Sequence, residues 1–289
     1  MPQKINVLDK KIVHQIIKSA LIEDLGDGDH TSLSTIPADE KGKAKLLVKE
    51  DGIIAGVKVA VEVCKEVDPD LNVEVLIEDG TTVRVGDIIL YVSGKVQSIL
   101  IAERLMLNLM QRMSGIATTT NKIVKHLEGT GTQVLDTRKT TPNLRYLEKL
   151  AVKIGGGVNH RFGLYDMILI KDNHIDYAGG IENAVKAAQA YLQNKNKKLQ
   201  IEVEVRNLGE LERVLAIGGV DRILLDNFSF EDLKKAVKAV NKTIPTEASG
   251  NITIDNALEY AKCGVDYISM GALTHSVKGL DLSLKAVVN

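Results

Sequence analysis

Cationic side chains gather in one stretch of the chain, residues 136–175. Among short apolar runs and glycine turns, those that stand near the ends of expected strands are Arg138, Lys139, His160, Arg161 and Lys171. The whole chain has a formal net charge of −1, so the local excess of positive charge is not part of a generally basic protein. Guanidinium and ammonium groups bind carboxylates and phosphates. We therefore predict an anion-binding pocket.

Carboxylates stand in a second group, further along the chain. In the run IEVEV, residues 201–205, alternation places Glu202 and Glu204 on one face of a strand. Burying both costs on the order of several kcal/mol unless each is paired or binds a metal. Lys171 is a candidate partner. Asp226 closes the next apolar run, and with Glu204 it suits sugar hydroxyls or a divalent cation carried on phosphates.

The turn Ser249–Gly250–Asn251 follows another apolar run. A turn of this kind can present backbone N–H groups to a phosphate, although a plain turn has the same sequence. The six histidines show no H-E-x-x-H spacing, so a histidine metal centre is not expected.

These groups stand at the ends of predicted strands. From about residue 130 short apolar runs alternate with amphipathic helical patterns, which predicts parallel strands joined by helices. The expected strands are 133–137, 152–155, 167–170, 201–205, 222–226, 244–248 and 266–270. The expected helices are 143–150, 181–192, 208–217, 230–240 and 254–263. Seven strands favour an incomplete barrel over an open sheet. No G-x-G-x-x-G motif follows a strand, which disfavours a dinucleotide fold.

The first part of the chain predicts a mixed α+β domain. Its clearest helix covers 102–113, where apolar residues recur at helical spacing and Gly115 is expected just past the end. Arg104 lies on the polar face of that helix, with solvent exposure as the plain explanation.

Composition excludes several classes of function. A near-zero net charge and the absence of a basic block argue against nucleic-acid binding. The longest apolar-rich region is interrupted by charges, so no membrane span is expected. Cys64 and Cys263 are predicted to be separate buried thiols in a reducing compartment. We expect a cytoplasmic protein.

At these residues the sequence resembles the quinolinate phosphoribosyltransferase family. The resemblance covers nearly the whole chain in one order and is most specific in its long central stretch. The matching stretches are EDLGDGDHTS, AERLMLNLMQRMSGIAT, DTRKTTPNLRYLEKLAVKIGGGVNHRFGLYDMILIKDNHI, IEVEV, LLDNF, EASGNI and ISMGALTHS.

The resemblance implies a fold and an assembly. The fold is an N-terminal open-faced α/β sandwich, residues 1–115, which 275–289 could join, followed by an incomplete six- or seven-stranded α/β barrel, residues 116–274. The assembly is a homodimer or larger, with each active site shared between subunits.

The resemblance also implies the reaction. A phosphoribosyl group passes from phosphoribosyl pyrophosphate to quinolinate, and nicotinate mononucleotide, pyrophosphate and CO₂ form in NAD biosynthesis. Mg²⁺ is the implied cofactor, held mainly through the pyrophosphate or also directly by Glu204 and Asp226.

Roles carry over residue by residue. Quinolinate would contact Arg104 of a neighbouring subunit and Thr137, Arg138, Lys139, His160, Arg161 and Lys171. Phosphoribosyl pyrophosphate would contact Glu204, Asp226, Ser249, Gly250, Asn251, Met270, Gly271 and Ala272. The catalytic set would be Lys139, Lys171, Glu204 and Asp226.

Three alternatives stay open at this point. A paralogue of the same family, such as the molybdate-uptake-associated protein, would keep the fold and change the substrate. A Schiff-base aldolase would use Lys171 or Lys139 as its nucleophile. A non-catalytic sensor would bind phosphoribosyl pyrophosphate without releasing pyrophosphate or CO₂.

Overall fold

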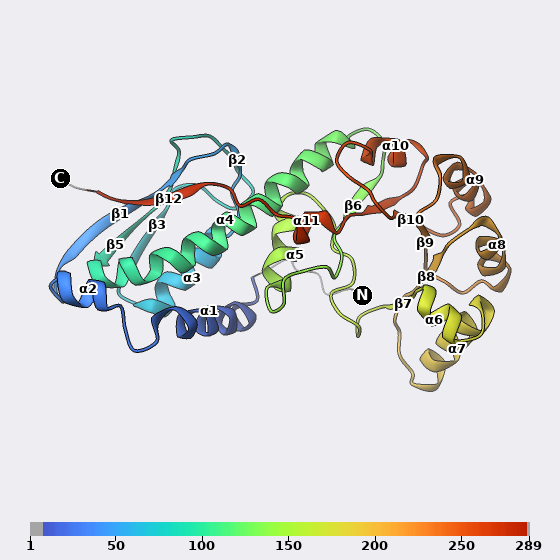
Figure 1. The fold of residues 1–289 in the computed structure, drawn as a ribbon, viewed down its shortest axis with the longest axis horizontal. Helices are drawn as coiled ribbons and strands as arrows, with labels where there is room; N and C mark the ends of the chain where they lie inside the picture. Colours follow the sequence, from blue (N-terminus) through green and yellow to red (C-terminus); the bar gives the residue numbers. More distant parts are fainter. Residues whose placement is uncertain (1–7, 288–289) are drawn as a thin grey trace. The chain divides into compact units, whose positions relative to one another are not determined.

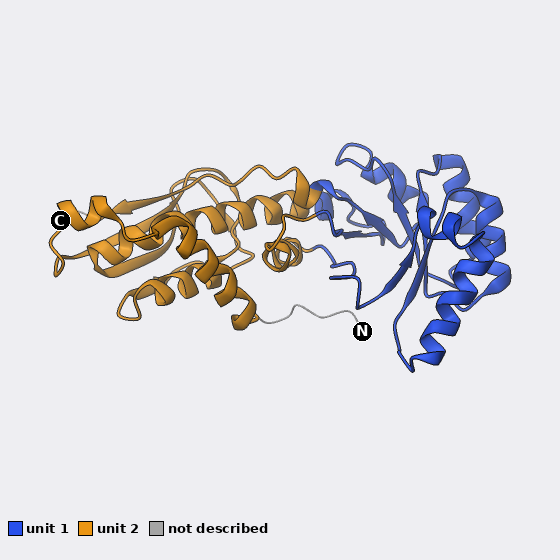
Figure 2. Cartoon of the chain, turned by 60° about the horizontal axis from the view of Figure 1, so that its bottom comes forward, with its two compact units in different colours: residues 1–4, 122–139, 157–272 blue, residues 5–121, 140–156, 273–289 orange. Residues whose placement is uncertain are grey.

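The computed structural model describes residues 8–287. The chain divides into two compact units, each considered by itself (Figure 2). The sheet unit comprises residues 8–121, 140–156 and 273–287, and the barrel unit comprises residues 122–139 and 157–272. Neither unit is one continuous piece of sequence. The expected division is 1–115, which 275–289 could join, and 116–274; in the structure the sheet unit also contains residues 140–156.

The sheet unit is built on a four-stranded antiparallel sheet in the order β12-β1-β5-β3 (Figure 1). Its strands are β1 (Lys41–Val48), β3 (Asn72–Val75), β5 (Ile88–Lys95) and β12 (Leu282–Ala286), and a small pair joins β2 (Gly52–Ile53) to β4 (Thr82–Val83). Burial alternates along the second half of β1, with Ala44, Leu46 and Val48 covered. One face of the sheet is therefore packed and the other is open, as an open-faced sandwich requires.

The helices of this unit before residue 157 are α1 (Lys10–Leu25), α2 (His30–Thr35), α3 (Val57–Val67), α4 (Val96–His126), which extends a few residues beyond it, and α5 (Arg145–Ile154). The Asp9 side chain caps α1 by accepting the N–H groups of Lys11 and Ile12, and Asp29 caps α2 in the same way. The acidic run at 27–29 is thus a helix-start turn.

The end of the chain returns to the first sheet. Strand β12 pairs with β1 in antiparallel register from Ala44↔Ala286 to Val48↔Leu282. The sequence allowed residues 275–289 to join the first domain, and the pairing of β12 with β1 agrees with this. Residues 288 and 289 lie outside the described residues. The short helix α11 (Ala272–His275) leads into this return.

Helix α4 is longer than predicted. The pattern predicted 102–113 with Gly115 as the stop, but the helix continues to His126, so a boundary at 115/116 falls inside it. A Cβ on Gly115 would collide with the carbonyl oxygen of Lys278. Gly115 therefore serves the close approach of another backbone segment and does not end the helix.

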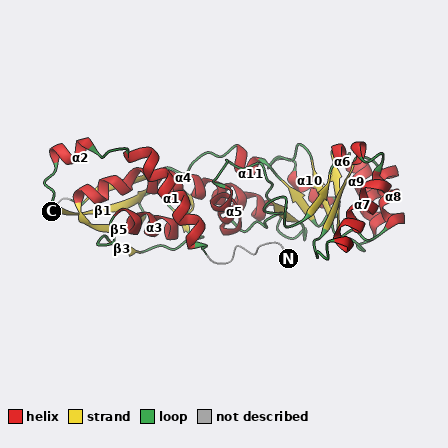
Figure 3. Cartoon of the chain, turned by 90° about the horizontal axis from the view of Figure 1, so that it is seen from below, coloured by secondary structure: helices red, strands yellow, loops and turns green. Residues whose placement is uncertain are grey.

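The barrel unit contains six parallel strands in the order β6-β11-β10-β9-β8-β7. They are β6 (Gln133–Leu135), β7 (Ile168–Ile170), β8 (Ile201–Val205), β9 (Arg222–Asp226), β10 (Thr246–Ser249) and β11 (Tyr267–Ser269). The helices are α6 (Asp172–Tyr177), α7 (Ile181–Asn194), α8 (Leu208–Ile217), α9 (Phe230–Val240) and α10 (Ala257–Lys262). Figure 3 shows this alternation of strands and helices. The incomplete α/β barrel is confirmed.

One predicted strand is wrong. Residues 152–155 form the last turn of α5 and its C-cap, not a strand. The run AVKI is short and apolar, and periodicity cannot separate a buried helix end from a buried strand in such a run. Val158 instead makes an isolated parallel bridge to Leu135, which extends the barrel sheet beyond β6.

The described residues contain no helix long and apolar enough to cross a membrane. Cys64 and Cys263 are both buried and unbridged, as predicted. Burial raises the pKa of the Cys64 thiol to about 12, so this group is an inert part of the core.

Gly115 offers a direct test of the α4 packing. We expect Gly115→Ala to lower the free energy of unfolding by roughly 1–3 kcal/mol, because the added methyl group must displace backbone at Lys278. Urea denaturation measures the loss. Gly209→Ala is the matched control within α8: its nearest contact would be the Asn207 side chain at 3.4 Å, and alanine favours the helix by about 1 kcal/mol. Equal effects of the two substitutions would contradict the close approach.

Candidate active site

The predicted site residues of the barrel unit follow its strands. Thr137, Arg138 and Lys139 come after β6, His160 and Arg161 after the bridge at Val158, and Lys171 after β7. Glu204 lies on β8, Asp226 ends β9, and Ser249 ends β10. The remaining ones follow β10 or β11: Gly250, Asn251, Met270, Gly271 and Ala272. The carboxyl ends of parallel strands meet at one edge, where α/β barrels bind their ligands.

Strand register places these charges on one face of the sheet. Glu202 pairs with Arg222, and Glu204 with Leu224; Glu247 pairs with Leu224, and Ser249 with Asp226. Since side chains alternate, all of these polar residues share that face. Contacts then separate them into two groups: Glu202, Arg222 and Glu247 gather around His160 and are called the lower layer, and Glu204, Asp226 and Ser249, towards the carboxyl ends, are called the upper layer.

The upper layer joins a lysine to two carboxylates. Lys171 Nζ lies 3.4 Å from Glu204 Oε2, the pairing that the sequence suggested. Burial raises the pKa of Glu204 more than the charge of Lys171 lowers it, and the charge of Asp226 raises it further. A positive charge entering this layer would be bound strongly, because it would relieve the repulsion between the two acids.

Asp226 is held by two neighbours. Its Oδ1 accepts the Ser249 hydroxyl at 2.5 Å, and its Oδ2 accepts Asn227 Nδ2 at 2.7 Å. Asn227 Oδ1 in turn accepts Asn251 Nδ2 at 3.3 Å. Gly250 has φ +97°, and a Cβ there would collide with the Asn227 carboxamide. The turn after β10 therefore requires glycine and is built onto the end of β9.

The lower layer is closed around His160. Its Nε2 lies 2.9 Å from Glu202 Oε2 and 3.4 Å from Glu247 Oε2, and Arg222 Nη1 lies 3.2 Å from Glu247 Oε2. Among the described residues this is the one His/Cys/Asp/Glu group with metal-ligand spacing, its ligand atoms lying within 4.8 Å of one another.

The hydrogen bonds of His160 determine whether this group can bind a metal ion. His160 Nδ1 accepts the N–H of Arg161 at 2.7 Å, so the proton of the neutral ring is on Nε2 and no lone pair there faces a metal. Burial opposes the charged ring, but Glu202 and Glu247 outweigh it and raise the pKa of His160 to about 9. Burial and the charge of Glu247 raise the pKa of Glu202 as well; the acceptor role of Nδ1 in the structure is that of the neutral ring.

Arg161 is 8% exposed and donates from Nη1 to the Met167 carbonyl at 3.3 Å. Burial lowers its pKa, and so does the charge of Arg138. Two guanidinium groups near enough to perturb each other repel unless an anion lies between them. The pair is therefore a candidate for the anion-binding half of the site.

The loop that carries Arg161 is tied to the end of β6. Asp136 Oδ1 accepts the backbone N–H of His160 at 2.9 Å, and Oδ2 accepts Asn159 Nδ2 at 2.6 Å. Asp166 accepts the N–H groups of Phe162 and Gly163. Both acids lie in the stretch singled out for its cations, and both shape its loop.

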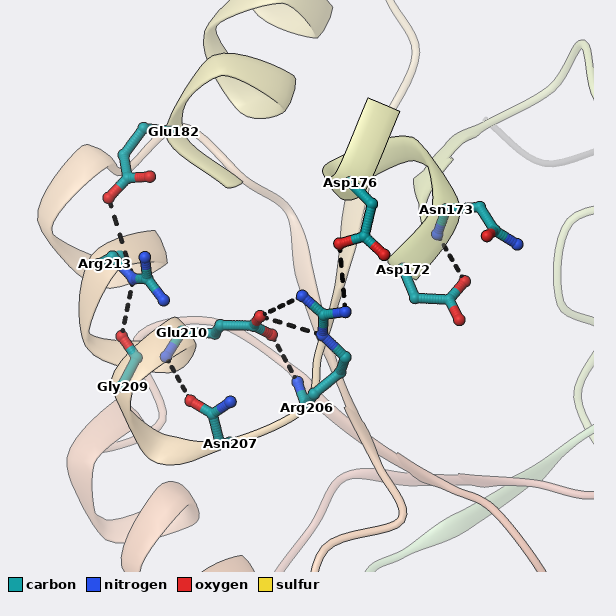
Figure 4. Close-up of polar contacts among 9 residues, drawn as sticks. All are labelled: Asp172, Asn173, Asp176, Glu182, Arg206, Asn207, Gly209, Glu210 and Arg213. Atoms are coloured by element: carbon teal, nitrogen blue, oxygen red, sulfur yellow. Dashed lines mark hydrogen bonds and ion pairs between the residues drawn. The ribbon is translucent and has the colours of Figure 1, made fainter. Parts of the chain in front are cut away.

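Lys171 immediately precedes the helix α6, and an arginine fastens that helix (Figure 4). Arg206, at the end of β8, donates to Asp176 on α6 at 3.3 Å and to Glu210 on α8 at 2.7 and 3.0 Å. Glu210 is 4% exposed. Arg206 therefore links the segment that follows Glu204 to the helix that follows Lys171.

Arg104 belongs to the other unit of the chain. It lies on α4 in the sheet unit with an exposed side chain, whereas the other predicted site residues up to Ala272 belong to the barrel unit.

Sequence reasoning missed the lower layer and Asn227. Glu202 was noticed only as a companion of Glu204. Glu247 and Ser249 show the same alternation within TEAS, a signal that was available. The φ of +55° at Asn227 has no counterpart in the sequence pattern.

Comparison with known proteins decides the family. The family model described as quinolinate phosphoribosyl transferase, C-terminal domain, matches residues 116–285, and the N-terminal domain model matches residues 29–114. The chain belongs to the quinolinate phosphoribosyl transferase family.

Curated and solved members of the family cover nearly the whole chain. The chloroplastic nicotinate-nucleotide pyrophosphorylase [carboxylating] of Arabidopsis thaliana is 48% identical over 93% of this chain and 81% of its own length. The probable nicotinate-nucleotide pyrophosphorylase [carboxylating] of Bacillus subtilis is 40% identical over 95% and 93%. The structure of the nicotinate-nucleotide pyrophosphorylase from Francisella tularensis superposes with a TM-score of 0.93 at 41% identity, over 99% of this chain and 100% of that one.

The Arg206 anchor makes a pH-dependent prediction. Burial would raise the pKa of Glu210, but the bonds from Arg206 outweigh it and lower the pKa below the usual 4.5. The stabilisation is therefore present above pH 4.5 and lost as pH falls through the lowered value. We expect Arg206→Ala to cost about 2 kcal/mol of unfolding free energy at pH 7, and less near pH 3, by urea denaturation.

Arg213→Ala serves as the control, because Arg213 lies on α8, the helix that carries Glu210. Its Nε lies 3.9 Å from Glu182 and both side chains are exposed, so its loss should stay below about 0.5 kcal/mol. A loss for Arg206→Ala that is the same at both pH values would show that the carboxylate of Glu210 is not the partner that matters.

Proposed function

We propose that this chain transfers the phosphoribosyl group of phosphoribosyl pyrophosphate to quinolinate and releases pyrophosphate and CO₂. Family membership supports the reaction, since the curated relatives carry that activity in their names. The assignment of residues rests on one observation at the edge of the barrel sheet. Arg138 and Arg161 follow other strands than those that carry Glu204 and Asp226.

Quinolinate is a dicarboxylate, and the cationic half of the site suits it. Arg138 and Arg161 supply guanidinium groups that pair with carboxylates in bidentate fashion. Lys139 and Lys171 add ammonium groups, and Thr137 a hydroxyl. His160 belongs to the same loop, although its ring nitrogens already contact protein groups.

Phosphoribosyl pyrophosphate suits the other half. Glu204 and Asp226 can accept hydrogen bonds from ribose hydroxyls. The turn Ser249–Gly250–Asn251 and the segment Met270–Gly271–Ala272 can donate backbone N–H groups to the 5′-phosphate. The constraint on Gly250 fixes the turn against Asn227, whose carboxamide a Cβ at residue 250 would strike.

Mg²⁺ is part of the proposal as the companion of the pyrophosphate. The donor set fits it: Glu204 and Asp226 offer hard carboxylate oxygens, and each oxygen of Asp226 keeps a lone pair beyond its single hydrogen bond. The ion would neutralise charge on the leaving group. Direct contact with the two carboxylates is the secondary possibility, and binding through the pyrophosphate oxygens the main one.

The chemistry follows from charge. The C1′–O bond breaks with its electrons going to pyrophosphate, and Glu204 and Asp226 stabilise the oxocarbenium-like ribose that remains. The pyridine nitrogen donates its lone pair to C1′ and becomes cationic. The adjacent C2 carboxylate then leaves as CO₂, its bonding electrons stay at C2 beside the positive nitrogen, and C2 takes up a proton. Lys139 and Lys171 hold the anionic groups throughout.

We propose an assembly of two or more subunits in which Arg104 serves the barrel unit of a neighbour. The exposed position of Arg104 in the sheet unit is consistent with this role. A cytoplasmic location is also proposed; several plant relatives are named chloroplastic or mitochondrial.

The direct test is CO₂ release. The purified chain, given carboxyl-labelled quinolinate, phosphoribosyl pyrophosphate and Mg²⁺, should release CO₂ and pyrophosphate in equal amounts. A paralogue with another substrate or a sensor would release neither. Trapping of a substrate adduct on Lys171 or Lys139 by borohydride would favour the aldolase and overturn the proposal.

Arg104→Ala separates the two halves of the site. We expect a 10- to 100-fold rise in the KM for quinolinate, because one charge-assisted contact of roughly 1.5–3 kcal/mol is lost. The KM for phosphoribosyl pyrophosphate should change little. Asn108→Ala, one turn along the same exposed face, is the control and should leave both values within about twofold.

Subunit mixing completes that experiment. At a quinolinate concentration low enough that each variant alone shows little activity, Arg104→Ala and Lys171→Ala chains are exchanged with each other, and a site shared between subunits should recover part of the wild-type activity. If no activity returns under conditions where exchange is demonstrated, each site is complete within one subunit.

A further inference from the structure

His160 uses both ring nitrogens within the barrel unit. Nε2 faces Glu202 Oε2 at 2.9 Å and Glu247 Oε2 at 3.4 Å, and Nδ1 accepts the N–H of Arg161 at 2.7 Å. The residue is 7% exposed. Both ring nitrogens therefore face protein groups; the Nε2 contact with Glu202 is a close polar contact at ion-pair distance, since neither oxygen of Glu202 has a hydrogen-bond partner among the described residues.

The two carboxylates that hold His160 are themselves fixed. Glu202 and Glu247 are completely buried. Arg222 donates to Glu247 at 3.2 Å, and its guanidinium lies 4.5 Å from the centre of the Tyr267 ring. Their strands β8, β9 and β10 are neighbours in the sheet, so the acceptors for Nε2 lie on rigid elements.

The support extends through His160 to the next residue. The ring accepts the backbone N–H of Arg161, and the backbone N–H of His160 donates to Asp136 at 2.9 Å. These bonds fix the position and direction of the chain where Arg161 begins. A guanidinium that must meet a carboxylate in bidentate geometry loses affinity when its backbone shifts.

We propose that Glu202, through His160, positions Arg161 for the substrate carboxylate, and that His160 is a rigid link and not itself a ligand of quinolinate. Glu247 and Arg222 complete the same support. The inference rests on the proposed role of Arg161 in binding quinolinate.

A metal ion is the competing occupant of this cluster. A metal needs the lone pair of Nε2, but the bond from Arg161 to Nδ1 leaves the proton on Nε2. The positive charge of Arg222 beside Glu247 disfavours a second cation as well. The donor chemistry therefore favours a hydrogen-bonded support.

Two substitutions at Glu202 test the proposal by steady-state kinetics. Glu202→Gln keeps an oxygen that can accept from Nε2, and the KM for quinolinate should stay within about threefold. Glu202→Leu has no acceptor, and we expect a rise of about tenfold or more, equivalent to the loss of one hydrogen bond. The KM for phosphoribosyl pyrophosphate should remain within about twofold for both.

Asp266→Asn is the control for a merely structural effect. Asp266 Oδ2 accepts the N–H and the hydroxyl of Thr246 at 2.8 and 2.9 Å at the amino end of β10. This variant should lower the melting temperature without separating the two KM values. An equal change of both KM values in Glu202→Leu, or no change, overturns the positioning role.

Nitrogen NMR of the wild-type protein with labelled histidine tests the link in a protein whose fold is unaltered. The His160→Asn variant is used only to assign the His160 signal, which it lacks. A protonated Nε2 and an unprotonated Nδ1 are expected. An unprotonated Nε2 together with one bound metal ion per chain overturns the proposal. A wild-type protein that releases no CO₂ refutes the proposed function, whereas an active one without the KM difference refutes only the positioning role.

Discussion

Two carboxylates on one face of β8 impose the constraint on which the barrel unit depends. Glu202 and Glu204 are both buried, and the low polarity of a protein interior makes unpaired charge there expensive. The neighbouring strands therefore have to supply partners at two levels. Arg222 compensates charge at the lower level, where His160 contacts both carboxylates, and Lys171 partly compensates the upper one.

The two levels differ in what they can still bind. In the lower layer a histidine, an arginine and two acids contact one another, and buried oxygens of Glu202 and Glu247 have no hydrogen-bond partner among the described residues. In the upper layer Lys171 and Glu204 are 3.4 Å apart, and burial and Asp226 keep the pKa of Glu204 raised. A cationic transition state and an anionic leaving group complement that layer. The two layers thus lie on the same three strands, β8, β9 and β10.

Much of this arrangement could be predicted from sequence. Alternation in IEVEV placed Glu202 and Glu204 on one face, and strand ends collected Arg138, Lys171 and Asp226 at one edge. The full length of α4 and the end of α5 could not be predicted. A local pattern does not show that the backbone of Lys278 approaches Gly115, or that the run AVKI continues a helix. The pairing of Arg222 with Glu247 depends on strand order, which periodicity does not give. The backbone at Asn227 is set by its contacts with Asp226 and Gly250, residues of different strands.

The division between the layers can be tested by equilibrium binding to Glu204→Gln. Calorimetry would measure quinolinate alone and the Mg²⁺ complex of phosphoribosyl pyrophosphate alone, each against the wild-type chain. Glu204 belongs to the ribose half, so the sugar substrate should lose about tenfold or more in affinity, the equivalent of one charge-assisted contact, while quinolinate binding stays within about twofold. A comparable loss for quinolinate would contradict the two-layer account.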